Sequence, residues 1–192
     1  MNHKIIKAVW SFFTALILAC LCTGCAKNKI PQVTNNKGLE QLFYGTWTVG
    51  AESTVELYAN AGTDDEKYAG KAVILSSNIL QFSENQVYSM EIASSIQSLT
   101  LTENSLYTEE EVTKQLENSI VINGKFSVDD DYLELLSETV VLNNTTTYSA
   151  AEYAQMDSTY GSEKQVVKWN LLGDSLDFAD LAGNVIVTYN RN

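Results

Sequence analysis

The sequence contains one histidine, His3, and three cysteines that all lie between residues 20 and 25. Residues 26–192 therefore contain neither residue type. Their absence excludes Ser-His-Asp and Cys-His catalytic machinery from that part of the chain, and zinc sites of the usual His/Cys kind. It also excludes the disulfide bonds that stabilise many small exported domains.

The N-terminus has the pattern of an export signal. Lys4 and Lys7 precede an apolar run at residues 8–21, and small residues at 23 and 24 follow it. The run is shorter than the ~20 apolar residues of most spanning helices, although a retained transmembrane anchor stays open as the alternative. We expect residues 1–24 to be a signal peptide that is removed.

Leu21-Cys22-Thr23-Gly24-Cys25 resembles a lipobox, in which a small residue precedes a cysteine that becomes diacylated. Cys22 stands where the usual motif has Leu. The resemblance implies that Cys25 carries lipid such as palmitate, and two acyl chains anchor a protein stably at ~0.8 kcal/mol per buried methylene. We therefore expect a protein held on the cell membrane or the outer membrane, facing outside the cytoplasm, with residues 25–37 as a flexible tether. Three chance cysteines in an apolar signal remain the alternative.

Basic residues are scarce after the expected cleavage. Ten basic residues then stand against 24 acidic ones, a net charge of −14. Such a body repels nucleic acid and anionic membrane surfaces. We expect no nucleic-acid partner, and solubility on a crowded surface accounts for the charge.

Residues 38–192 are long enough for a single domain with its own core. Apolar residues alternate with polar ones at residues 88–92, 167–171 and 185–189, which predicts strands with one buried face. Asn123-Gly124 lies between two apolar runs and predicts a hairpin turn. Gly173 and Gly183 mark further turns.

Two capping boxes predict short helices. Residues 108–111, with Tyr107 and Val112 placed for a hydrophobic staple, open one helix that runs to about residue 118. Residues 149–152 open another that runs to about residue 156. The fold class that follows is mainly β: an antiparallel meander, closed or nearly closed into a barrel of about 8–10 strands, with two short helical insertions.

The two ends of the domain carry a further motif. Gly45-Thr46-Trp47 begins the first strand pattern, and Tyr189-Asn190-Arg191, with the only arginine of the chain, ends the last one. Both resemble the lipocalin-like domains of bacterial lipoproteins, in which a short helical turn leads into Gly-x-Trp and a C-terminal Arg often packs over the Trp. The resemblance implies a lipocalin-like barrel with Gly45, Trp47 and Arg191 at its closed end. A guanidinium on an indole face contributes about 0.5–2 kcal/mol.

Acidic triplets are the candidate sites for other chemistry. They are Asp64-Asp65-Glu66, Glu109-Glu110-Glu111 and Asp129-Asp130-Asp131. The second lies at a predicted helix N-terminus, where acids interact favourably with the dipole, and the others are expected to be solvated loop tips. Whether Asp129, Asp130 and Asp131 bind a cation such as Ca²⁺ is left open. No metal site, cofactor or catalytic residue is expected, with a carboxylate-based hydrolase as the alternative.

The interpretation favoured by these observations is a lipid-anchored, non-catalytic binding domain for a small apolar or amphipathic ligand. The alternative is an envelope protein-interaction or structural lipoprotein with a solid barrel. Tyr148, Tyr153 and Tyr160 in the second helical insertion are the candidate recognition residues, because tyrosine offers an apolar face with a polar tip.

Overall fold

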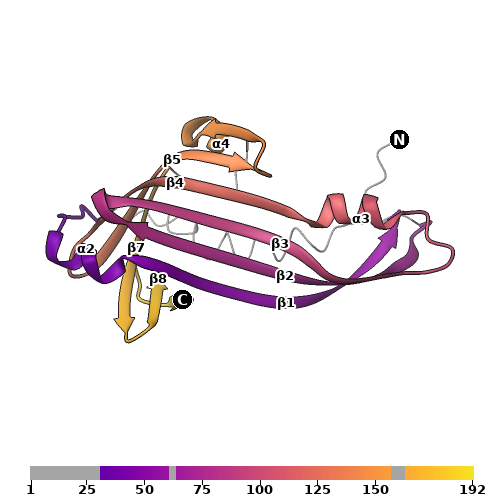
Figure 1. Ribbon diagram of the computed structural model, residues 1–192, viewed down its shortest axis with the longest axis horizontal. Coiled ribbons are helices and arrows are strands. Elements are labelled where there is room, and N and C mark those ends of the chain that lie inside the picture. The colour runs from indigo at the N-terminus through magenta and orange to yellow at the C-terminus, as the bar shows by residue number, and fades with distance from the viewer. Residues whose placement is uncertain (1–30, 61–63, 157–162) are drawn as a thin grey trace.

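The computed structural model describes residues 31–60, 64–156 and 163–192, so the predicted signal peptide, Cys25 and Tyr160 lie outside the described residues. The described chain is mainly β (Figure 1). Its helical elements are α2 (Lys37–Phe43), the 3-10 turn η2 (Glu84–Gln86), α3 (Glu109–Leu116) and α4 (Ala150–Met156). Its strands are β1 (Gly45–Ala59), β2 (Lys67–Ser83), β3 (Val87–Leu101), β4 (Asn118–Val128), β5 (Tyr132–Leu142), β6 (Thr146–Ser149), β7 (Lys164–Leu172), β8 (Ser175–Ala179) and β9 (Val185–Arg191).

The strands close into an antiparallel barrel. Their order is β4-β3-β2-β1-β9-β8-β7-β5, and β5 pairs in turn with β4. The remaining strand, β6, pairs with residues 139–142 of β5. It lies on the same side of β5 as β7, beyond the point where the pairing of β5 with β7 ends. The predicted fold class is therefore confirmed. From β1 to β9 each strand of the barrel pairs with the next one along the chain, with β6 passed over between β5 and β7, and the pairing of β9 with β1 closes the circle.

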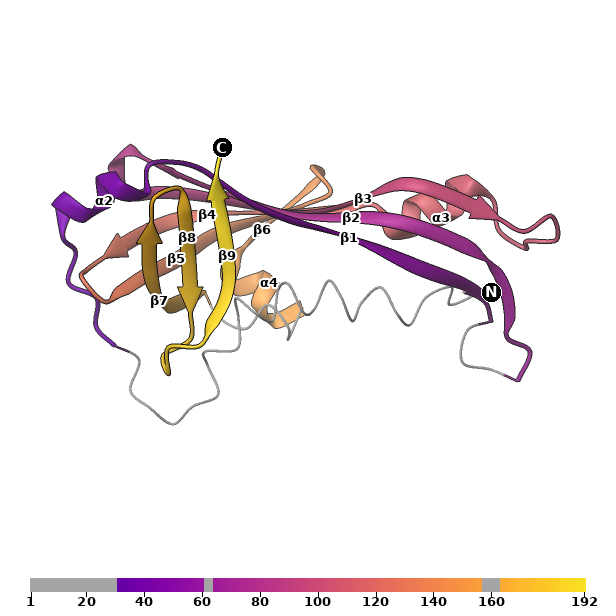
Figure 2. The same ribbon diagram turned by 90° about the horizontal axis from the view of Figure 1, so that it is seen from below.

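Strands β1, β2 and β3 extend well beyond the end of the barrel. β9 pairs with β1 only at Trp47↔Arg191 and Thr48↔Asn190, and β4 stops pairing with β3 at Ser94↔Asn118. Beyond these points β1, β2 and β3 continue as a three-stranded sheet, which we call the arm (residues 52–59, 67–75 and 95–101). Figure 2 shows the arm running away from the barrel, with α2 at the opposite end of the molecule.

The arm has a hydrophobic core of its own. The amphipathic helix α3 lies over it and buries Val112 and Leu116. The arm residues of this core are Val55, Leu57, Ala69, Ala72 and Ile74. They lie on the strand face that continues the interior face of the barrel, because side chains alternate along each strand. The described residues therefore form two apolar cores, one inside the barrel and one under α3.

Both predicted capping boxes form. The Thr108 hydroxyl accepts a hydrogen bond from the Glu111 N–H, while the Glu111 carboxylate accepts one from the Thr108 N–H. Ser149 and Glu152 make the same reciprocal pair at the start of α4. The resemblance implied the third helix, α2, which leads into Gly45.

Part of the expected tether contacts the domain. The backbone N–H of Thr34 donates to the Asp129 carboxylate, and that of Asn36 donates to the Val128 carbonyl. Asn36 then caps α2 through its side chain, which accepts from the Gly38 N–H. Hydrogen bonds to the barrel are thus already made at Thr34, four residues before the expected domain start at Gly38.

The predicted hairpin turn at Asn123-Gly124 is wrong. Both residues lie inside β4, where the register with β5 shifts by one residue. A Cβ atom on Gly124 would lie 2.1 Å from the Leu136 carbonyl oxygen and 2.9 Å from the Tyr88 ring. Glycine is required here for the close approach of a neighbouring strand and a ring, which is its other common role in a strand.

Candidate binding surfaces

Gly45, Trp47 and Arg191 come together at the end of the barrel beside α2. Trp47 is fully buried, and its Nε1 donates to the Phe43 carbonyl at 2.7 Å. The Arg191 guanidinium carbon lies 4.4 Å from the centroid of the Trp47 ring. One guanidinium nitrogen also donates to the Leu42 carbonyl at 2.8 Å. This is the contact that the resemblance implied, and it ties the last strand to the first strand and to α2.

Aromatic side chains fill the barrel near this end. Seven of them are at most 2 % exposed: Phe43, Trp47, Phe82, Tyr88, Phe126, Phe178 and Tyr189. Edge-to-face ring contacts join Phe43 to Phe82 and to Trp169, with centroids 5.5 and 5.0 Å apart. Phe82 contacts Phe126 in the same way at 4.8 Å. These side chains occupy the space with one another, as in the packed interior of an ordinary domain.

A polar layer lies between the two cores. Asn78 on β2 is 1 % exposed, and neither atom of its side-chain amide has a hydrogen-bond partner among the described residues. Its neighbours across the sheet are Val49 and Ile92. In the next layer toward the arm, the Ser94 hydroxyl donates to the Leu116 carbonyl at the end of α3. An unpaired buried amide costs about 1–3 kcal/mol, so Asn78 is either tolerated at that cost or bonded by a water or ligand.

The acidic triplets have structural roles or lie in solvent. Asp129 accepts from the backbone N–H groups of Asp131 and Tyr132 through one carboxylate oxygen, and from Thr34 through the other. Asp130 and Asp131 are exposed, as are residues 64–66. Within the described ranges, no group of three or more Asp or Glu side chains is arranged to hold a metal ion.

The carboxylates with shifted pKa values are explained by helix caps and turns. The backbone N–H and then the hydroxyl of Thr108 lower the pKa of Glu111. The hydroxyl and then the backbone N–H of Ser149 lower the pKa of Glu152. The side-chain amide and backbone N–H of Asn184 lower the pKa of Asp180 in the turn before β9. In each case the partner favours the charged form, as a structural hydrogen bond does.

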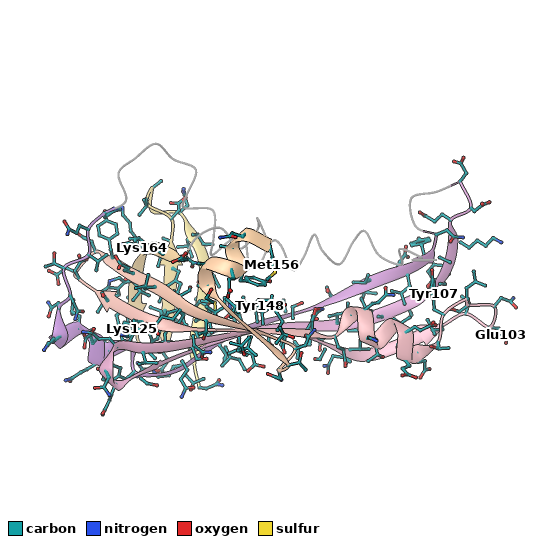
Figure 3. The ribbon with its side chains drawn as sticks, turned by 90° about the horizontal axis from the view of Figure 1, so that it is seen from above. Glu103, Tyr107, Lys125, Tyr148, Met156 and Lys164 are labelled. Atoms are coloured by element: carbon teal, nitrogen blue, oxygen red, sulfur yellow. The ribbon has the colours of Figure 1, made fainter. Side chains whose placement is uncertain are left out.

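The tyrosines of the second insertion do not all lie on the expected surface. Tyr153 is buried in the barrel core, and Tyr148 packs partly buried against it with ring centroids 6.2 Å apart. Tyr148 lies in β6 and Tyr153 in α4, and Figure 3 shows Tyr148 and Met156 on this segment beside the barrel. The interpretation of Tyr153 as a recognition residue is therefore wrong, because its ring is buried in the barrel core, whereas the partly exposed Tyr148 stays a candidate.

The outer edge of β1 is a feature that the sequence analysis missed. From Val49 to Ala59 this strand pairs with β2 on one side, and its pairing with β9 has already ended. No described residue pairs with the other side of β1 between Gly50 and Glu56. Gly50, Glu52, Thr54 and Glu56 are all exposed there. Only the short length of the last strand pattern hinted that β1 would extend past its neighbour.

No helix in the described part of the chain is long and apolar enough to cross a bilayer. Comparison of the chain with protein-family models and with curated proteins gives no match. The geometry above is therefore the basis for the function proposed next.

Proposed function

We propose that the chain is an extracytoplasmic lipoprotein, anchored through Cys25, that binds a protein partner through the arm. The observation that carries this proposal is the structural difference between the barrel end and the arm end of the molecule. The barrel interior beside α2 is filled by aromatic side chains, whereas β1, β2 and β3 leave the barrel and present an exposed sheet (Figure 2). A filled barrel with an extended sheet fits a scaffold better than a calyx.

A non-catalytic role is part of the proposal. Residues 26–192 contain no histidine or cysteine. Glu111, Glu152 and Asp129 use their carboxylates to accept backbone N–H groups. These contacts hold helix and turn geometry, which supports a binding module over a carboxylate-based hydrolase.

The position of the anchor supports display of the arm. Thr34, nine residues after Cys25 in the sequence, donates a backbone hydrogen bond to Asp129 of the barrel. Nine residues span at most about 32 Å, so an anchor on Cys25 would keep the domain close to the bilayer. Because α2 and the arm lie at opposite ends of the molecule, the arm lies away from the end where the anchor joins (Figure 2).

Mass spectrometry of the N-terminal peptide tests the lipoprotein part of the proposal. The mature chain should begin at Cys25 and carry a diacylglyceryl group, and Cys25→Ser should abolish that mass. Cys22→Ser is the matched control and should keep the lipid. An uncleaved N-terminus, or lipid retained on Cys25→Ser, would contradict the anchor.

A small amphipathic ligand is the second candidate, and the buried amide of Asn78 favours it. A ligand that reached this layer would meet both a donor and an acceptor of the amide, with the half-buried Val49 and Ile120 beside them. Native mass spectrometry of the gently purified chain tests this candidate. An extra mass that disappears on denaturation would support it. The mass of the protein by itself would count against it and favour the scaffold proposal.

A further inference from the structure

We infer that the outer edge of β1, residues 50–56, accepts an extended basic segment of a partner protein, which adds a strand to the arm. The inference rests on the proposed function and names the surface and the chemistry of the partner. It follows from the backbone groups of this edge, from its lack of protection and from its charge.

The direction of the backbone groups comes from the pairing with β9. The N–H of Asn192 donates to the Thr46 carbonyl, so the even-numbered residues of β1 face β9. Backbone groups alternate between the two edges along a strand. The N–H and C=O groups of Gly50, Glu52, Thr54 and Glu56 therefore point to the side where β9 no longer lies. Each of these residues offers one donor and one acceptor to a new strand.

This edge lacks most of the usual protection against strand addition. Natural edge strands are shortened, bulged, covered or marked with charged side chains, especially lysine, or with proline, and this one carries only two glutamates. β1 has 15 residues, contains no lysine or proline, and pairs with β2 in one continuous register from Gly45 to Leu57. An exposed edge of this length is the feature that β-augmentation uses, in which main-chain hydrogen bonds supply affinity.

Charge indicates what the added strand carries. The exposed Glu52 and Glu56 lie four residues apart, so both side chains extend from the same outer face. Tyr58 donates to one oxygen of the Glu56 carboxylate at 2.6 Å, and Lys71 of β2 lies opposite Glu56 on its other side. A strand with Lys or Arg at two positions four residues apart would place a cation opposite each glutamate.

The same charges disfavour a second copy of this chain as the partner. In an antiparallel pair of β1 edges centred on Thr54, Glu52 of each copy would lie opposite Glu56 of the other. Like charges in directly opposite positions destabilise a sheet. The net charge of −14 expected for residues 25–192 adds to the repulsion between copies.

The inner face adds a second element of specificity. On this face the free edge carries small residues at Ala51 and Ser53 and then the buried Val55 of the arm core. An added strand would therefore place apolar residues beside Val55 and small residues beside Ala51. The partner segment is thus amphipathic with period two: basic and polar outward, apolar inward.

Selection from a random library of 12-residue peptides displayed on phage tests the inference. The full-length chain, purified in mild detergent, serves as the target, and selected peptides are then synthesised for affinity measurement. We expect them to carry Lys or Arg four residues apart. Binding should weaken about tenfold or more on Thr54→Pro, which removes one outward N–H and blocks its partner carbonyl. It should also weaken at high salt.

The charge variant keeps the test valid if the proline variant does not fold. Glu52→Lys/Glu56→Lys should weaken binding about tenfold or more, since two attractions become repulsions. Asp130→Lys/Glu103→Lys is the matched control, because it changes the net charge equally. Asp130 lies in the turn between β4 and β5, and Glu103 lies at the tip beyond the arm (Figure 3). The control should bind within about twofold of the wild type.

The contrary outcomes separate the two proposals. Peptides that bind Thr54→Pro and Glu52→Lys/Glu56→Lys as well as the wild type would overturn the edge as the site, and would leave a protein-binding role in place. A selection without enrichment over bare beads would overturn both. A wild-type dimer that Thr54→Pro converts to a monomer in sedimentation analysis would overturn the basic partner in favour of a second copy.

Discussion

Replacement of Gly124 by alanine should destabilise the barrel by about 3 kcal/mol or more, at the upper end of the cost of overpacking. The new Cβ would lie 2.1 Å from the Leu136 carbonyl oxygen and 2.9 Å from both the Leu136 carbonyl carbon and the Tyr88 ring. The first two atoms belong to the paired backbone of β5, and the ring is buried with its hydroxyl 2.9 Å from the Ser137 Oγ. None of these atoms can swing aside, so β4 and β5 must separate by roughly 1 Å to restore ordinary contact.

Thermal unfolding followed by circular dichroism measures this effect. At about 2–4 °C per kcal/mol for a chain of this size, the midpoint should fall by about 6–12 °C. Gly50→Ala is the matched control in another strand. Its Cβ would meet only the Ser76 carbonyl at 3.3 Å and a Leu75 methyl at 3.7 Å, so its stability should stay within about 1 kcal/mol of the wild type. A Gly124→Ala protein that melts within about 2 °C of the wild type would refute the close approach of β5 to Gly124.

Three further predictions concern single contacts. Arg191→Met keeps the apolar stem but removes the guanidinium from Trp47, and should lower the free energy of unfolding in urea by about 1–2 kcal/mol; an unchanged value would contradict the role given to this contact. Asn78→Leu removes a buried amide that no described residue bonds and should raise stability by about 1–3 kcal/mol, whereas a loss would indicate that a water or ligand bonds the amide. Glu111→Ala should lower stability at pH 7, and urea titrations should show its gap to the wild type closing as the pH falls. The pKa of Glu111 is lowered from its ordinary 4.5 in the fold, so its contribution is present above that pH and is lost as pH falls through the lowered pKa; a gap independent of pH would refute this.

Elements whose signals lie within a few residues were predictable from the sequence. The capping boxes that begin at Thr108 and Ser149 need only a side chain and a backbone N–H three residues apart, and both helices start as predicted. Gly173 and Gly183 have positive φ angles of 62° and 96° and form the predicted turns on either side of β8. Period-two alternation correctly marked the strands, because it reports directly which face of a strand is buried.

The Asn123-Gly124 prediction failed because one dipeptide fits two environments. Both a tight turn and a close approach to another strand require a residue without a Cβ. The choice depends on Tyr88 from β3 and Leu136 from β5, which local sequence does not place beside Gly124. The prediction for Tyr153 failed for the same kind of reason, since its burial depends on the barrel core against which α4 packs.

The sequence by itself determined the mainly β class, the helix starts, the acidic body and the absence of histidine and cysteine from residues 26–192. Only the tertiary structure decided where the barrel ends and the arm begins. Val49 and Val55 continue the same alternation in β1, yet one packs with the barrel core and the other under α3. The period of a strand shows that a face is covered, but not which element covers it. The free edge of β1 exists because β9 stops pairing with β1 after Thr48, and strand pairing across the chain sets that limit.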